Sequence, residues 1–131
     1  MRALYLDSSA FVKVIVEEPG SIALREYLAG ESARFVSYAL LRTEALRGVR
    51  QQGPEVRTAV RAGLRRIELI AIDDRILDTA GTLEPQVLRT LDAIHVASAL
   101  AVGDDLVALV TYDERMIASA RQLGLPTATP S

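Results

Sequence analysis

The sequence contains no cysteine, no tryptophan and no asparagine, and only one histidine and one lysine occur among its 131 residues. Without cysteine there are no disulfide bridges, thiolate metal sites or cysteine nucleophiles. A single histidine excludes sites that need two, and a serine–histidine–aspartate triad would have to use His95. The lone Lys13 argues against lysine chemistry such as Schiff bases or a P-loop. Carboxylates and hydroxyls remain, and carboxylates bind hard metal ions through oxygen.

Length and the lack of long apolar runs describe the class of protein. A chain of 131 residues with 50% hydrophobic content favours one domain, residues 1–131. Asp7 interrupts the N-terminus before a signal-peptide core could form. The longest uncharged apolar run near the middle, residues 93–103, is too short to cross a bilayer. We therefore predict a cytoplasmic protein without membrane contacts.

Short apolar runs alternate with helical patterns along the chain. Strands are predicted at residues 2–6, 34–37, 67–72, 106–111 and, more weakly, 126–129. Helices are predicted at residues 8–18, 21–29, 38–52, 55–66, 75–83, 90–102 and 113–123. Continuously apolar strands are typical of buried parallel sheets. The pattern predicts a three-layer α/β/α fold around a central, mostly parallel sheet of four to five strands.

Charge is distributed unevenly, although the formal net charge is only -2. Residues 42–66 contain seven arginines and two acids, so the rest of the chain is strongly acidic. Ordinary solvated helix faces would account for this segment. The alternative is an arginine-bearing helical arm that meets phosphate groups or a partner protein.

Two aspartates directly follow predicted strands. Asp7 comes after residues 3–6, and Asp113 comes after residues 109–112. Ligands of open parallel sheets bind beyond the carboxyl ends of the strands, which makes both residues candidates for a site. Each also begins a predicted helix, so N-capping is an equally simple explanation for either one.

Two further acids are predicted to lie on apolar helix faces, away from solvent. Asp92 opens a helix that is apolar on nearly every side, and a buried carboxylate there needs a partner. Glu44 falls on the apolar face of the helix predicted at 38–52, where capping does not apply and an ion pair with an arginine is the structural alternative. Four converging carboxylates would repel one another unless a divalent cation neutralised them. Oxygen-only ligation selects Mg²⁺ or Mn²⁺ and indicates phosphodiester hydrolysis.

Around these acids the sequence resembles the PIN-domain ribonucleases, and in particular the VapC toxins of bacterial toxin–antitoxin pairs. The matching segments are residues 5–10 (YLDSSA), 41–44 (LRTE), 91–99 (LDAIHVASA) and 110–115 (VTYDER), in the family's order. The resemblance covers essentially the whole chain. It implies a PIN-like fold and a metal-dependent endoribonuclease, a hydrolase that cuts RNA with Mg²⁺, or Mn²⁺, as cofactor.

The resemblance also implies residue roles and partners. The family's acidic quartet is matched by Asp7, Glu44, Asp92 and Asp113 as catalytic residues, and we expect Asp7, Asp92 and Asp113 to bind the metal. Ser9 and Thr111 match the hydroxyl positions that support these carboxylates. The implied partners are an RNA substrate, a second copy in a homodimer, and a cognate VapB-type antitoxin that covers the active site.

Several alternatives remain beside this interpretation. The main one is a non-catalytic RNA-binding or antitoxin-binding module with the same fold, although an intact quartet argues against it. A phosphotransfer receiver domain needs a lysine after a late strand, whereas Lys13 lies in the first predicted helix. A haloacid-dehalogenase-type phosphatase needs an aspartate where Ser9 stands. His95, one turn after Asp92, is expected to be structural.

Overall fold

The computed structural model describes residues 1–131 and contains a five-stranded parallel sheet with the order β3-β2-β1-β4-β5. Its strands are β1 (Ala3–Leu6), β2 (Arg34–Tyr38), β3 (Glu68–Ile70), β4 (Leu106–Val110) and β5 (Thr127–Ala128). All four residues of β1, the central strand, are buried, because helices cover both faces of the sheet. The predicted fold class is confirmed.

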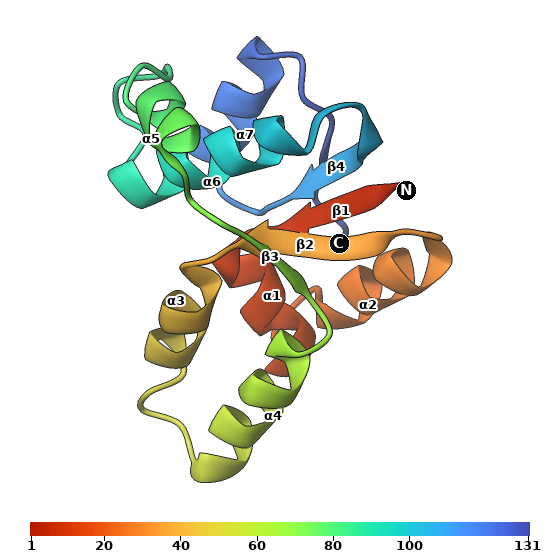
Figure 1. Ribbon diagram of the computed structural model, residues 1–131. Coiled ribbons are helices and arrows are strands. Elements are labelled where there is room, and N and C mark those ends of the chain that lie inside the picture. Colours follow the sequence, from red (N-terminus) through yellow and green to blue (C-terminus); the bar gives the residue numbers. More distant parts are fainter.

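Seven α-helices form the two outer layers (Figure 1). One face of the sheet carries α1 (Ser8–Ile15), α2 (Ser21–Gly30), α3 (Leu41–Gly48) and α4 (Pro54–Leu64). The other face carries α5 (Asp74–Ala80), α6 (Thr90–Val102) and α7 (Glu114–Gln122), and the short 3₁₀ turn η1 (Gly103–Asp105) precedes β4. None of the helices has the length and apolar character needed to cross a bilayer.

The order of the strands creates a switch point in the middle of the sheet. From β1 the chain moves outward to β2 and β3, then returns to the other side of β1 to form β4 and β5. The connections that follow β1 and β4 therefore leave toward opposite faces, which opens a crevice beyond their carboxyl ends. Asp7 lies at this point, and its backbone N–H donates to the carbonyl of Val110 at 3.2 Å.

Helix α6 is the buried helix that its composition predicts, with the expected bounds. Residues 93–99 are all buried, because α6 packs against the sheet and lies between α5 and α7. Its N-terminal turn brings Asp92 toward the carboxyl edge of the sheet, and His95 follows inside the protein. Helix α6 therefore carries both Asp92, at the edge of the sheet, and a buried segment of the core.

One local prediction that bears on the site is wrong. The helix predicted at 38–52 begins only at Leu41, because Tyr38 belongs to β2, and so Glu44 lies in the first turn rather than in the middle of the helix. Gly20, with a φ of 90°, occupies the N-cap position of α2. Ser21 is buried, and its hydroxyl donates to the carbonyl of Lys13 at 2.8 Å.

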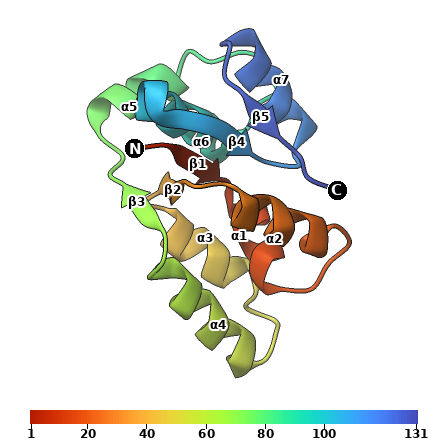
Figure 2. The same ribbon diagram turned by 90° about the vertical axis from the view of Figure 1, so that its right-hand side faces the viewer.

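Helices α3 and α4 form the end of the molecule that lies farthest from α5 and α7 (Figures 1 and 2). Helix α4 approaches α1 closely at Gly63, where a Cβ atom would lie 3.0 Å from Ile15 Cδ1 and 3.1 Å from Phe11 Cζ. The absence of a side chain at this position allows the two helices to touch. This contact packs α4, which belongs to the arginine-rich residues 42–66, against α1, the helix that follows Asp7.

Candidate active site

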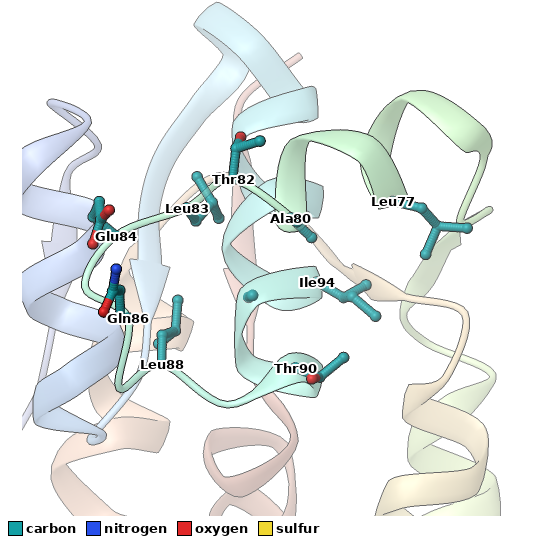
Figure 3. Close-up of a pocket in the computed structure, with 11 residues that line it drawn as sticks. Leu77, Ala80, Thr82, Leu83, Glu84, Gln86, Leu88, Thr90 and Ile94 are labelled. Atoms are coloured by element: carbon teal, nitrogen blue, oxygen red, sulfur yellow. The ribbon is translucent and has the colours of Figure 1, made fainter.

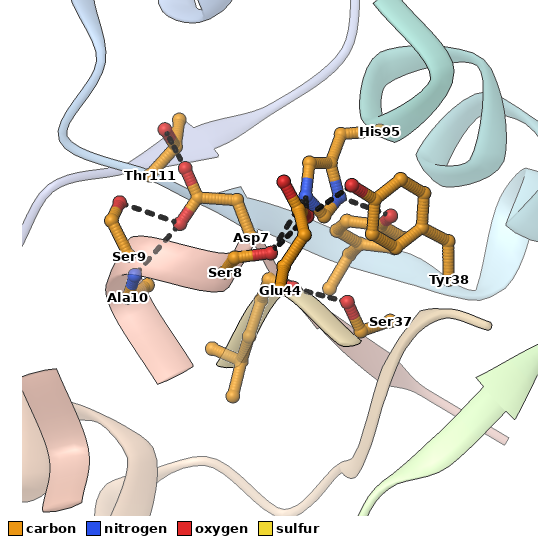
Figure 4. Close-up of polar contacts among 11 residues, drawn as sticks. Asp7, Ser8, Ser9, Ala10, Ser37, Tyr38, Glu44, His95 and Thr111 are labelled. Atoms are coloured by element: carbon orange, nitrogen blue, oxygen red, sulfur yellow. Dashed lines mark hydrogen bonds and ion pairs between the residues drawn. The ribbon is translucent and has the colours of Figure 1, made fainter. Parts of the chain in front are cut away.

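Asp7 is held rigidly at the end of β1 (Figure 4). Its Oδ1 accepts hydrogen bonds from Ala10 N at 2.8 Å and from Ser9 Oγ at 3.1 Å, and its Oδ2 accepts one from Thr111 Oγ1 at 2.6 Å. The side chain is buried, and burial raises the pKa of its carboxyl group although these hydrogen bonds oppose the shift. Asp7 therefore caps α1 and also presents a costly buried charge at the switch point.

Asp113 occupies the corresponding position after β4. Its Oδ1 accepts from Met116 N at 3.0 Å and so caps α7. Its own backbone N–H donates to Thr111 Oγ1 at 3.1 Å, while the same hydroxyl donates to Asp7. Thr111 thus joins the ends of the two neighbouring strands and sets the position of one acid relative to the other.

Asp92 lies in the first turn of α6 and makes no capping hydrogen bond. Burial raises the pKa of its carboxyl group, and the nearby charges of Asp113, Asp7 and Glu44 raise it further, although His95 opposes them. The four predicted acids therefore share one electrostatic environment, which four separate sequence segments bring together.

Glu44 has no arginine partner, contrary to the structural alternative. Its Oε1 instead accepts hydrogen bonds from the hydroxyls of Ser8 and Tyr38 and lies 3.2 Å from His95 Nε2. Burial by itself would raise the pKa of Glu44, but the three donors outweigh it and lower the pKa to about 2. The side chain is 25% exposed, so an ionised carboxylate faces the site.

His95 lies behind Glu44 and is 2% exposed. Its ring stacks on Tyr38 with the centroids 3.6 Å apart, and its Nδ1 lies 2.7 Å from the hydroxyl oxygen of Tyr5. A structural histidine is what the sequence predicts, whereas its partners Ser8, Tyr38 and Tyr5 are apparent only in the structure. The available signal was a lone histidine on a helix without a polar face, because a buried imidazole needs hydrogen-bond partners.

Other polar side chains have local, structural roles. Tyr5 is fully buried. Tyr112 donates to the carbonyl of Pro130 at 2.7 Å, and Lys13 Nζ lies 4.2 Å from the centre of its ring. Asp73 caps α5, its Oδ1 accepting from the backbone N–H of Ile76 at 2.9 Å.

The acids suit a hard cation by their chemistry, although they are not drawn together into a coordination shell. No three histidine, aspartate or glutamate side chains lie close enough to one another to hold a metal ion in this arrangement. The donors are all carboxylate oxygens, and their mutual repulsion is visible in the raised pKa of Asp92. A divalent cation would relieve that repulsion, so the residues fit Mg²⁺ or Mn²⁺ in donor type and charge.

A hollow opens on the Glu44 side of the site. It has a volume of about 250 Å³ and is lined by residues of α1 and α3, including Ser8, Ser9 and Glu44. A larger hollow of about 480 Å³ lies between α5, α6 and the loop that joins them (Figure 3). Its lining includes Leu77, Leu88 and none of the four acids, whereas the smaller hollow is lined by Glu44.

The seven arginines of residues 42–66 form no ion pair with any acid. Three of them, Arg42, Arg61 and Arg65, line a groove of about 380 Å³ between α3, α4 and β3. Uncompensated guanidinium groups around a shared groove favour phosphate or another anion.

Comparisons with known proteins give a family match and several relatives. A family profile described as PIN domain matches residues 4–122. Ribonuclease VapC46 of Mycobacterium tuberculosis is 50% identical over 131 residues, which is the full length of both chains. Ribonuclease VapC35 of the same species is 39% identical, over 97% of this chain and 96% of the relative.

Two solved structures share the fold. A VapBC2 structure from Rickettsia felis, bound to a DNA fragment from the promoter, aligns with a TM-score of 0.74 at 17% identity and covers 98% of this chain and 99% of its own. A toxin–antitoxin complex from Klebsiella pneumoniae aligns with a TM-score of 0.73 at 21% identity and 98% coverage of both chains.

Proposed function

The chain belongs to the PIN domain family, and we propose that it is a VapC-type toxin, an endoribonuclease whose activity depends on Mg²⁺ or Mn²⁺. The observation that supports the chemistry most directly is the raised pKa of Asp92, which Asp113, Asp7 and Glu44 raise beyond the effect of burial. Charges that repel one another in this way disfavour the ionised form of Asp92 unless a cation offsets them, and a metal-dependent active site would account for their arrangement.

Asp7, Asp92 and Asp113 would hold the metal ion at the carboxyl ends of β1 and β4. A bound Mg²⁺ would polarise the phosphodiester and lower the pKa of the attacking water. Ser9 and Thr111 keep the Asp7 carboxylate in one orientation, and Thr111 also holds the backbone that carries Asp113. Pre-oriented carboxylates need little rearrangement during the reaction.

Hydrolysis adds water across one phosphodiester bond of the RNA. The water oxygen forms a bond to phosphorus, and the bond from phosphorus to the leaving ribose oxygen breaks. One proton of the water leaves with an acceptor at the site, and the leaving oxygen takes up a proton. Glu44 is held ionised and lines the hollow, and we assign to it the role of accepting a hydrogen bond from that water.

The partners follow from the same assignment. We expect an RNA substrate whose phosphates contact the arginine groove of α3 and α4, a VapB-type antitoxin that blocks the site, and a homodimer in solution. Its activity would then lie in the cytoplasm, together with its RNA. Sedimentation equilibrium of the purified toxin tests the homodimer, and a mass of one chain at all concentrations would contradict it.

Cleavage of RNA by antitoxin-free protein tests the enzymatic proposal. We expect cleavage in Mg²⁺ or Mn²⁺, none in EDTA, and recovery when the divalent ion is restored. Asp7→Asn and Asp92→Asn should be inactive, whereas Asp78→Asn, on the exposed surface of α5, should remain active. Equal cleavage by the Asp92→Asn variant would show that the site assignment is wrong.

A non-catalytic RNA-binding or antitoxin-binding module is the second candidate. The observation on its side is that no three of the acids lie close enough together to hold an ion as they stand. Under this alternative the protein binds RNA in EDTA as tightly as in Mg²⁺ and cleaves it in neither. Parallel binding and cleavage assays on one preparation separate the two functions.

A further inference from the structure

The hydrogen bonds around Glu44 are unusual because all of them end on one oxygen. Ser8 Oγ, Tyr38 Oη and His95 Nε2 all approach Oε1, and none approaches Oε2 (Figure 4). The three donors come from α1, β2 and α6. Because an ionised carboxylate is only an acceptor, each partner must turn a proton toward Oε1. One oxygen of Glu44 is thus satisfied by the protein, and the other is left for the site.

The proton on His95 can be assigned from its opposite side. The hydroxyl of Tyr5 makes its one hydrogen bond to His95 Nδ1, at 2.7 Å. Ser37 and Ser98 do not compete for it, since Ser37 donates to the carbonyl of Leu6 and Ser98 makes no hydrogen bond. A tyrosine hydroxyl carries its proton at neutral pH, so it donates this proton to Nδ1. A neutral imidazole then carries its proton on Nε2, which faces Glu44.

Packing prevents the ring from adopting another orientation. The ring of His95 stacks on Tyr38 with an interplanar angle of 26° and meets Tyr5 edge-on, with centroids 5.6 Å apart. The imidazole is 2% exposed, and its two nitrogens lie between Tyr5 on one side and Ser8 and Glu44 on the other. A ring flip would place a carbon where each hydrogen bond now is.

We propose that His95, fixed by Tyr5 as the Nε2–H tautomer, is a positioning residue that binds Glu44 Oε1 and leaves Glu44 a single free oxygen for the reaction. This inference rests on the proposed nuclease function only for its effect on the rate. The arrangement makes Glu44 a one-oxygen group, because using Oε1 for a cation or substrate would break three hydrogen bonds. Glu44 therefore differs in kind from the aspartates of the quartet.

The tautomer can be measured without any RNA, because the chain contains one histidine. Protein labelled with ¹⁵N-histidine should give, at neutral pH, one protonated nitrogen at Nε2 and one unprotonated nitrogen at Nδ1 in a long-range ¹H–¹⁵N spectrum. Tyr5→Phe should weaken this preference and populate the Nδ1–H form. A ring protonated on Nδ1, or on both nitrogens, in the wild type would overturn the proposal. Ser119→Ala removes a buried hydroxyl without a partner and should leave the spectrum unchanged.

Two substitutions at His95 test the effect on catalysis. Glutamine can place an amide N–H near the position of Nε2, whereas the shorter asparagine reaches only the position of Nδ1. We expect His95→Asn to lower kcat by about 10- to 100-fold at unchanged KM, and His95→Gln to recover most of that loss. Circular dichroism confirms that both variants are folded. Equal losses in the two variants, or a loss confined to KM, would contradict the positioning role.

If the wild type cleaves no RNA, the nuclease proposal fails while the spectrum still decides the tautomer. If the wild type cleaves RNA and its histidine is protonated on Nδ1, the nuclease proposal stands and the positioning role fails. The two results are therefore separable on one preparation.

Discussion

At the scale of single residues, the acids of the site fall into two kinds. Asp92 is surrounded by like charges and by protein that raises its pKa, whereas Glu44 receives three donors that lower its pKa to about 2. Ionised Asp92 therefore destabilises the fold, and ionised Glu44 stabilises it. The difference arises from hydrogen-bond donors, because burial opposes ionisation in both.

Removing the charge of Asp92 should make the protein more stable. In EDTA and low salt at neutral pH, Asp92→Asn should raise the free energy of unfolding by less than about 1 kcal/mol, because solvent screens a half-buried carboxylate. Urea unfolding followed by circular dichroism measures the change, since the chain has no tryptophan. The gain should fade in acid, where wild-type Asp92 is itself protonated. Asp78→Asn is the exposed control, and a less stable Asp92→Asn variant would contradict the prediction.

Glu44 should have the opposite effect. Its folded pKa of about 2 lies below the usual 4.5, so its contribution to stability is present above pH 4.5 and is lost as the pH falls toward 2. Glu44→Gln should lower the free energy of unfolding at pH 7 by about 1–3 kcal/mol and should flatten its acid dependence. Urea titrations at several pH values test this, with the exposed Glu55→Gln as control. Parallel acid profiles for wild type and Glu44→Gln would refute it.

At the scale of elements, α3 and α4 form an arm with a divided surface. Glu44 on α3 faces α1 and the site, whereas Arg42 and Leu46, on the other side of the same helix, line the arginine groove with α4. A helix about 10 Å across separates the two. RNA that reaches both the site and the arginine groove must pass around α3. The groove would then bind phosphates other than the one at the bond that is cut.

The arginine groove should contribute salt-dependent affinity without base preference. Arg61→Ala combined with Arg65→Ala should weaken RNA binding and reduce the slope of log K against log salt by about 1.4, for two phosphate contacts with a single strand. Fluorescence anisotropy with an inactive Asp7→Asn background measures both quantities. The matched control is Arg75→Ala with Arg121→Ala, which lie on the opposite face of the sheet. If the groove receives the antitoxin instead, RNA affinity stays the same and antitoxin affinity falls.

At the scale of the whole molecule, the site joins the two helical layers that cover the sheet. Asp7 and Glu44 come from the side that carries α1 to α4, and Asp92 and Asp113 come from the side that carries α5 to α7. Thr111 bridges the two sides through Asp7 and the backbone of Asp113. Repulsion among these acids therefore acts between layers, and a cation bound there would stabilise the complete fold.

A divalent ion should accordingly raise the melting temperature. Mg²⁺ at about 100 times its dissociation constant should add about 2.7 kcal/mol to the free energy of unfolding of the wild type. Asp7→Asn with Asp92→Asn should lose most of this gain and should already be stabilised in EDTA. Thermal melts by circular dichroism with and without Mg²⁺ provide the comparison, and NaCl at equal ionic strength controls for general screening. Identical Mg²⁺ shifts in both proteins would argue against the metal assignment.

Local patterns in the sequence predict the elements and most of the acids. Continuous apolar runs predicted all five strands, and the unbroken apolar character of residues 90–102 predicted the bounds of α6. Asp7 and Asp113 were recognisable because strand ends and helix caps are local features, encoded within a few residues. The start of α3 was missed, because Tyr38 fits a helix by local pattern and joins β2 only through its neighbours in the sheet.

The surroundings of these acids follow from the packing of segments that are distant in the sequence. Strands β1 and β4 lie side by side, although their paired residues are more than 100 positions apart in the sequence. This pairing follows from the order of the strands and brings Thr111 to Asp7. The partners of Glu44 lie in three other elements, and no periodicity connects residues 8, 38 and 95. Hydrogen bonds depend on distances of a few ångströms between segments that the chain separates widely. Residue type therefore indicated carboxylate chemistry, and only the packing of α1, β2 and α6 distinguished Glu44 from the aspartates.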